Sequence, residues 1–266
     1  MSFRNLHKPG DPFILANAWD AGSAKMLAAL GAEAIATSSA AHAFTLGRTD
    51  GGTVSRDEAL AHAQDLMSAV DLPVSGDFEN GFGHDPDICA ETVRLSGEIG
   101  LAGIGIEDTA FPEMKAYDFD LAVERIRAAA SAARALPHDF VLVARADGVM
   151  EDFYDIQEAL RRIRAFDEAG ADCLYVPMPK SMDDLKRIIG ATAKPVNVLV
   201  AGPYAKHTKT DYAAMGAARL SLGSALARVT HKIIAEAGQS MFGRGDFSDL
   251  SNSISGAVVD DILQGK

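Results

Sequence analysis

The amino-acid sequence predicts a single (β/α)8 TIM barrel, and three observations lead to this fold class. The chain has 266 residues, close to the roughly 250 that are typical of one such barrel. Eight short apolar segments alternate with longer segments rich in Ala, Leu, Arg and Glu, with no linker between two halves. Four of the apolar segments directly follow a glycine that ends a helical pattern. A doubly wound open sheet is the alternative, but no glycine-rich fingerprint follows the first expected strand.

The expected strands are short and almost entirely apolar, which is typical of strands buried on both faces. In chain order they lie within 12–17, 29–39, 72–77, 98–108, 139–147, 168–177, 194–201 and 214–223. The expected helices lie at about 20–30, 56–69, 86–99, 119–135, 155–168, 181–190, 208–215 and 223–237. Their expected N-caps include Ser55 or Asp57, Asp118 and Ser181. The sequence therefore predicts one barrel domain over 1–238 and a C-terminal extension over 239–266.

Composition excludes several classes of function. The chain has 25 Lys and Arg against 37 Asp and Glu, a net charge of −12, which disfavours binding to nucleic acid or anionic lipid. No apolar stretch is long enough to cross a membrane, and the N-terminus lacks the pattern of a signal peptide. We therefore expect a cytoplasmic protein. Cys89 and Cys173 lie inside apolar segments and are expected to be buried, unreactive thiols.

Polar residues gather at the carboxyl ends of the expected strands, where barrel enzymes carry their active sites. These residues are Asn17, Asp20, Thr37, Ser38, Ser39, Asp77, Glu79, Glu107, Asp108, Arg145, Asp147, Pro177, Asn197 and Ser221. Several carboxylates at one small mouth would repel each other strongly. A hard divalent cation resolves this conflict, and Mg²⁺ prefers such oxygen ligands. The sequence thus predicts a Mg²⁺ site, with Mn²⁺ able to replace it.

Two residues in this set have an alternative, structural interpretation. Asp77 closes the third strand in GDFENGFG (76–83), so it can face the mouth, but it could instead cap a helix or pair with Arg145. Arg145 offers a fork that matches a substrate carboxylate. It could equally form a structural ion pair with Asp77 or Glu107. His42 and His84 are expected in loops near the mouth, where either could carry protons.

The order of TSSA (37–40), GDFENGFG (76–83), GIGIED (103–108), VARAD (143–147) and PVNVL (195–199) resembles the isocitrate lyase/phosphoenolpyruvate mutase superfamily. The resemblance extends over about residues 11–237. Within the superfamily, the sequence resembles the branch that contains 2-methylisocitrate lyase and oxaloacetate decarboxylase. It implies a Mg²⁺-dependent barrel that acts on a small carboxylate substrate. It also implies a homo-oligomer, a tetramer, in which the C-terminal helix packs on a neighbouring subunit.

The resemblance also assigns roles to individual residues. It implies Asp77, Glu79 and Glu107 as metal ligands, partly through water. It implies that Ser38, Ser39 and Ala40 form the carboxylate and oxyanion pocket, with Asp50 near the metal waters. Arg145 would hold the substrate and Asn197 would face the site. The expected catalytic residues are Arg145, Asp50 and Ser38.

The sequence departs from the named subfamilies where they place their proton donor or phosphoryl ligands. The lyases carry a Lys-Arg-Cys-Gly-His loop after the fourth strand, whereas this chain reads TAFPEMKAYDFD (109–120). The phosphonomutases have Lys and Asn where this chain has Glu113 and Lys115. We therefore expect a lyase that cleaves or decarboxylates a small 2-keto or 2-hydroxy (di)carboxylic acid through a metal-stabilised enolate. The alternatives are a phosphonate enzyme of the mutase or hydrolase type, and a non-catalytic α-keto acid binder.

Overall fold

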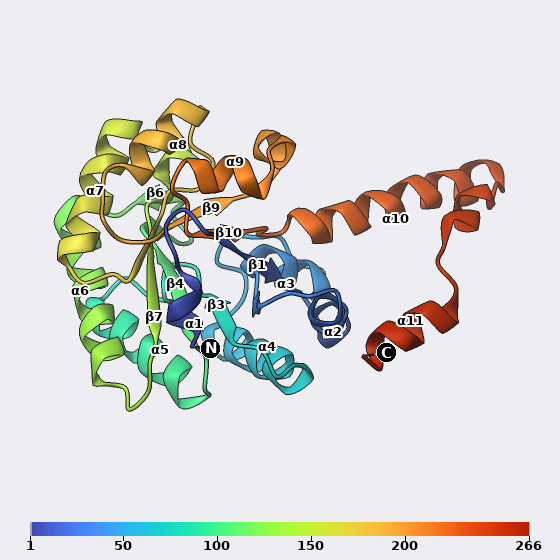
Figure 1. Cartoon of the computed structure of the whole chain (residues 1–266), viewed down its shortest axis with the longest axis horizontal. Coiled ribbons are helices and arrows are strands. Elements are labelled where there is room, and N and C mark those ends of the chain that lie inside the picture. The colour runs from blue at the N-terminus through green and yellow to red at the C-terminus, as the bar shows by residue number, and fades with distance from the viewer. Residues whose placement is uncertain (1, 266) are drawn as a thin grey trace.

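A closed ring of parallel strands forms the centre of the molecule (Figure 1). The structure is a computed structural model that describes residues 2–265. The ring consists of β1 (Phe13–Asn17), β2 (Ala34–Ala36), β3 (Val74–Asp77), β4 (Gly103–Glu107), β7 (Val141–Arg145), β8 (Cys173–Tyr175), β9 (Val196–Leu199) and β10 (Arg219–Ser221). Strands pair in this order, and β10 closes the ring on β1. Each strand lies within a predicted segment, so the (β/α)8 barrel is confirmed.

Helices follow the strands and cover the outside of the barrel (Figure 1). They are α2 (Ala21–Ala29), α4 (Arg56–Ala69), α5 (Pro86–Glu98), α6 (Phe119–Ala135), α7 (Ile156–Glu168), α8 (Met182–Ile189), α9 (Lys209–Ala214) and α10 (Ala225–Arg244). Ser55 begins α4 with a capping box, because its side chain accepts from the Glu58 N–H while Glu58 accepts from the Ser55 N–H. Ser181 caps α8, whereas Asp118 makes no side-chain cap bond.

Side chains alternate between the barrel interior and the helical layer. Ile35, Leu142 and Leu174 pack outward in the large core beneath the helices. Leu15, Val143 and other inward residues form a second core inside the barrel. Cys89 and Cys173 are both buried free thiols, and burial raises the pKa of each to about 11. This confirms the expectation that both are buried; their lack of reactivity stays a prediction.

A short N-terminal helix, α1 (Phe3–Leu6), closes the amino-terminal end of the barrel, and the sequence analysis did not anticipate it. Phe3 and Leu6 belong to the interior core with Phe13. The ring of His7 meets the ring of Phe13 edge-on, with 5.0 Å between centroids. His7 is therefore buried against the interior core. A helix of four residues is too short to show the periodic spacing of apolar residues by which helices are recognised in a sequence.

Two further segments differ from the expected pattern. Residues 39–45 form a short helix, α3 (Ser39–Thr45), directly after the TSSA turn begins, so His42 lies in a helix and not in a loop. The segment after β4 forms a hairpin of β5 (Thr109–Ala110) and β6 (Lys115–Ala116). Both segments fold over the carboxyl ends of the barrel strands and help to enclose the site.

The C-terminal part of the chain extends away from the barrel (Figure 1). Helix α10 continues to Arg244, and a short helical turn at Ser248–Asn252 leads to α11 (Gly256–Leu263), which approaches α2. The expected domain boundary at residue 238 falls inside α10, so the division of the chain at that point stays a prediction. Among the described residues, no helix has the length and apolar character needed to cross a membrane.

Candidate active site

A cavity of about 270 Å³, here called the inner cavity, opens at the carboxyl ends of the strands. The predicted site residues that line it are Ser38, Ser39, Ala40, Asp50, Asp77 and Arg145. An adjoining cavity of about 270 Å³ shares Ser39, Asp50, Arg145 and Met150 with the first. We call it the acidic cavity because its lining includes Asp50, Glu79, Glu107, Asp147 and Glu151. The structure therefore brings nearly all of the predicted residues to one mouth.

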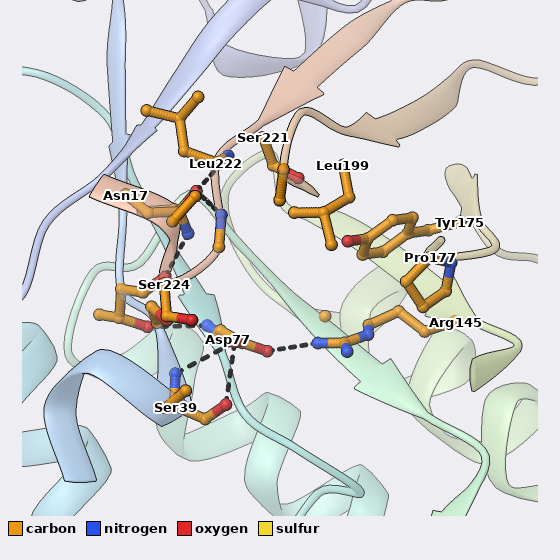
Figure 2. Close-up of a pocket in the computed structure, with 18 of the residues that line it drawn as sticks. Asn17, Ser39, Asp77, Arg145, Tyr175, Pro177, Leu199, Ser221, Leu222 and Ser224 are labelled. Carbon is orange, nitrogen blue, oxygen red and sulfur yellow. Dashed lines mark hydrogen bonds and ion pairs between the residues drawn. The ribbon is translucent and has the colours of Figure 1, made fainter. Parts of the chain in front are cut away.

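An ion pair between Asp77 and Arg145 lies where the two cavities meet (Figure 2). The distance between Arg145 Nη1 and Asp77 Oδ1 is 2.6 Å. The other oxygen of Asp77 accepts hydrogen bonds from the backbone N–H and the hydroxyl of Ser39, at 3.0 and 3.1 Å. Asp77 thus links β3 to the first turn of α3 and to β7.

Arg145 is surrounded by carboxylates. Besides Asp77, its Nη2 lies 2.9 Å from Glu107 Oε2 and 2.6 Å from Asp147 Oδ2. Burial opposes the charge of this guanidinium, but the carboxylates of Asp147, Glu107 and Asp77 outweigh burial and raise its pKa. The structural interpretation of Arg145 as an ion-pair partner of Asp77 and Glu107 is therefore correct for this state. Its role in holding a substrate stays a prediction.

The carboxylates of the acidic cavity are crowded. Burial, together with the charges of Asp77 and Asp50, raises the pKa of Glu79 to about 7. Burial and neighbouring carboxylates also raise the pKa of Glu107 well above its ordinary value. Burial and the charge of Asp77 raise the pKa of Asp50. These three groups are the ones that an additional positive charge in the cavity would stabilise most.

The donor chemistry of this cavity fits a hard divalent cation, since its acidic groups offer carboxylate oxygens. Within residues 2–265, however, no three or more His, Cys, Asp or Glu side chains converge closely enough to hold a metal ion directly. Arg145 occupies the point between Asp77 and Glu107. Glu79 turns aside, because its Oε1 accepts from the Gly52 N–H at 3.0 Å. The assignment of Asp77, Glu79 and Glu107 as metal ligands stays a prediction.

The TSSA turn supplies the start of α3. The Ser38 hydroxyl accepts from the Ala41 N–H at 3.3 Å and so caps this helix. Ser38, Ser39 and Ala40 all line the inner cavity, as predicted. The Ser39 N–H is already used by Asp77, so a bound oxyanion would compete with that carboxylate.

Asn197 is buried inside the barrel rather than in the lining of either cavity. Its Nδ2 donates to the Ser221 hydroxyl at 2.8 Å, and its Oδ1 accepts from Arg219 Nε at 3.1 Å. Both partners line the inner cavity. Asn197 can therefore orient groups of the site, whereas direct contact with a ligand stays a prediction.

Sequence reasoning missed Arg219 and Tyr175. Arg219 is the charged residue in the otherwise apolar segment AARLSLG, and it shares the inward face of β10 with Ser221. This two-residue spacing was the available signal. Tyr175 lies beside Arg145, whose guanidinium carbon is 5.2 Å from the centre of the tyrosine ring. Both residues line the inner cavity.

Other strand-end residues have structural roles. Asn17 Oδ1 accepts from the N–H groups of Leu222 and Gly223, which joins β1 to the loop after β10 (Figure 2). Asp20 caps α2. Asp108 points outward and pairs with Arg162 at 2.8 Å.

The histidine candidates do not line the inner cavity, although His42 lines a small neighbouring pocket with Ser38 and Asp77. His42 stacks on His62, with ring centroids 3.8 Å apart. The ring of His84 contacts the Tyr117 hydroxyl, and its Nε2 lies 3.9 Å from Glu113 at the surface. None of these side chains lines the inner or the acidic cavity.

Comparison with known proteins places this site in a family. The sequence matches the phosphoenolpyruvate phosphomutase family over residues 3–242. The chain belongs to this family. The resemblance to the isocitrate lyase/phosphoenolpyruvate mutase superfamily is thereby confirmed, as is the expectation of a lyase-type enzyme of this superfamily, and the exact reaction is left open.

Several relatives are similar along most of the chain. An uncharacterised protein of Mycobacterium tuberculosis H37Rv is 34% identical over 225 residues, covering 84% of this chain and 82% of the relative. The 2,3-dimethylmalate lyase of Eubacterium barkeri is 32% identical over 183 residues, covering 66% of this chain and 62% of the relative. A crystal structure from Burkholderia cenocepacia J2315, provisionally assigned as a lyase/mutase, has a TM-score of 0.91 and 41% identity, covering 97% of this chain and 93% of the other.

Proposed function

We propose that the protein is a Mg²⁺-dependent lyase that cleaves or decarboxylates a small 2-keto or 2-hydroxy acid. The observation that carries this proposal is the meeting of two chemically opposite cavities at the Asp77–Arg145 pair. The inner cavity offers hydroxyl groups and cations, which suit carboxylate oxygens. The acidic cavity offers carboxylates, which suit a cation. A 2-keto or 2-hydroxy acid that chelates a metal ion suits both cavities. Its carboxylate oxygens suit the inner cavity, and the metal ion suits the acidic cavity.

Asp77, Glu79 and Glu107 are the residues that would hold the cation, partly through water. When bound, a divalent cation would neutralise the negative charge that develops on the substrate oxygen as the bond breaks. The raised pKa values of Glu79 and Glu107 support this assignment, because burial and neighbouring carboxylates disfavour their charged forms, and a bound cation would offset that effect.

The chain's own residues would bind and orient the substrate. Ser38 and Ser39 present a hydroxyl-rich helix start to the inner cavity. Arg145 can donate two N–H groups of its guanidinium to a substrate carboxylate, once one of its three carboxylate partners moves away. Asp50 lines both cavities, so it can contact groups on either side of the ion pair. Tyr175 and Leu199 line the inner cavity and limit the access of water (Figure 2).

A phosphonate substrate is less favoured by the charges around the acidic cavity. Among the described side chains that line the acidic cavity, Arg145 is the only cation. Three carboxylates already surround its guanidinium group. A phosphonate dianion bound in the acidic cavity would face further carboxylates, such as Glu79 and Glu151.

The proposal is tested by a screen of 2-keto and 2-hydroxy acids with one or two carboxylates, supplemented with Mg²⁺ or Mn²⁺. Release of pyruvate or another keto acid is the readout, and Asp77→Asn is the matched inactive control. Turnover that needs metal and is lost in Asp77→Asn supports the lyase. Phosphate release from phosphonopyruvate alone would favour the phosphonate alternative. Binding of keto acids without any turnover would identify a non-catalytic binder.

We further infer that the protein forms a homo-oligomer, with a tetramer as the expected form. Large apolar side chains are exposed along the projecting α10 and the segment after it: Val229, Ile233, Ile234, Phe242, Phe247, Leu250, Ile254 and Val258. Phe242 is 91% exposed. A second copy of the chain would cover this apolar surface, as the family resemblance implies.

A further inference from the structure

Arg219 is a buried cation that has no carboxylate partner within residues 2–265. The residue is 6% exposed and begins β10, from which its side chain faces the barrel interior. Its Nε donates to Asn197 Oδ1 at 3.1 Å. Its Nη1 is buried and has no hydrogen-bond partner. An isolated buried guanidinium is strongly unfavourable unless an anion or several acceptors meet it.

The contrast with Arg145 shows how unusual this environment is. Arg145 lies in the same barrel and has three carboxylates within 2.9 Å. Arg219 has none within ion-pair distance, and burial lowers its pKa. The charged and titratable groups that act on Arg219 are Cys173, Tyr175, Asp77 and the repelling Arg145.

The floor of the barrel does not neutralise Arg219 either. His7, on the N-terminal plug, is close enough for the charge of Arg219 to contribute to lowering the histidine pKa to about 3, after burial. The histidine is therefore neutral at physiological pH. Its Nδ1 faces the Phe3 carbonyl oxygen at 3.0 Å, and its Nε2 is buried without a partner.

The inner cavity gives a ligand access to Arg219. Arg219 lines this cavity together with the Asp77–Arg145 pair and with two small residues, Ser75 and Gly105. Asn197 holds the guanidinium in place from the side, since its own amide group is oriented by Ser221. Arg219 is thus held beside a space that opens to the barrel mouth, with its Nε donor already used by Asn197.

We propose that Arg219 binds the second carboxylate of a dicarboxylic substrate at the floor of the inner cavity. This proposal rests on the proposed function above, because it assumes that the 2-keto or 2-hydroxy end lies at Ser38 and the acidic cavity. It narrows the substrate class to 2-keto or 2-hydroxy dicarboxylic acids, since a monocarboxylic acid would leave the buried guanidinium without an anion.

Malate and lactate form a matched pair of probes, because they share a 2-hydroxy acid end and differ by the second carboxylate. Their dissociation constants are measured by calorimetry with Mg²⁺ present, for the wild-type protein, Arg219→Met, Arg219→Lys and Arg228→Met. Arg228 lines the same cavity but is exposed, so Arg228→Met controls for a general loss of positive charge.

The wild-type protein is expected to bind malate at least about 10-fold more tightly than lactate, the size of one charge-assisted hydrogen bond. Arg219→Met should abolish this preference and leave lactate affinity nearly unchanged, whereas Arg219→Lys should keep part of it. Arg228→Met should keep it in full. The melting temperature of unliganded Arg219→Met should stay equal or rise, because an unpaired buried charge is removed.

An unchanged malate preference in both Arg219→Met and Arg219→Lys overturns the proposal and identifies a structural arginine. A preference lost equally in Arg228→Met also overturns it. The outcomes separate the two proposals: a preference that depends on Arg219 without turnover of any acid supports the subsite and contradicts the lyase. Turnover of these acids, with no preference for malate that depends on Arg219, supports the lyase and contradicts the subsite.

Discussion

Arg145 reaches Asp77 across the inner face of β4, with 2.6 Å between Nη1 and Oδ1. β4 lies between β3 and β7 in the ring, so the arginine side chain has to pass over its neighbour strand. A small residue at position 105 leaves this path open, because a Cβ added to Gly105 would lie 3.5 Å from Arg145 Cδ, at ordinary contact distance. A longer side chain at this position would occupy the path of the arginine.

The effect of a substitution at Gly105 on stability and ligand binding should therefore depend on the size of the new side chain. Gly105→Ala should leave the fold and ligand binding nearly intact, because its methyl group only touches Arg145. Gly105→Leu should displace Arg145 and lower the free energy of unfolding by about 1–3 kcal/mol, as overpacking does. Thermal or urea unfolding and oxalate binding measure both effects. Equal behaviour of the two variants would contradict the path assigned to Arg145.

Metal binding should be weak without a chelating ligand and should tighten at least about 10-fold with oxalate, because a small chelator replaces bound water. Calorimetry with Mn²⁺, with and without oxalate, measures this coupling. Glu107→Gln should weaken Mn²⁺ binding, whereas Glu91→Gln, at an exposed acid on α5, should not. Equal affinity with and without oxalate would argue against the proposed site.

Removal of one partner from the buried pair of Asp108 and Arg162 should be strongly destabilising. Arg162→Met leaves Asp108 buried without its cation, so the free energy of unfolding should fall by about 3–5 kcal/mol. Arg161→Met, at the exposed neighbour that pairs with Glu158, should change it by less than about 1 kcal/mol. Urea denaturation of both variants is the measurement.

The contribution of His42 to stability should fall as the pH is lowered from 6.5 towards 4. Burial, with the adjacent His62, lowers the pKa of His42 from 6.5 to about 4. In this window the unfolded chain binds a proton at residue 42 and the folded chain does not, so protonation favours unfolding. The contribution of His42 is up to about 3 kcal/mol. His42→Phe should remove this contribution, so lowering the pH from 6.5 to 4 should lower the urea midpoint less than in the wild-type protein, whereas His138→Gln, at an exposed site, should match the wild type.

The apolar surface of α10 and the segment after it should govern assembly. Phe242→Asp combined with Phe247→Asp should shift the protein from an oligomer to a monomer, because a charge in an apolar interface is desolvated without a partner. Light scattering coupled to size exclusion measures the mass. Arg127→Asp on the exposed face of α6 is the control. A wild-type protein that is already monomeric would contradict the inferred assembly.

Local signals in the sequence were sufficient for the barrel. The glycine that ends each of four helices, the eight apolar strands and the Ser55 capping box depend on neighbouring residues, and the structure follows them closely. The two short helices α1 and α3 were not predictable in this way. Their places depend on contacts with the barrel ends, which no local period reveals.

The sequence by itself determined the fold, the family and the set of polar residues at the barrel mouth, because strand ends of a parallel barrel must meet at one face. Only the tertiary structure decided how those residues pair. It assigned three carboxylates to Arg145 and none to Arg219. The reason is physical: an ion pair depends on the direction and burial of side chains from strands far apart in the chain, and residue type and spacing along the sequence do not contain that information.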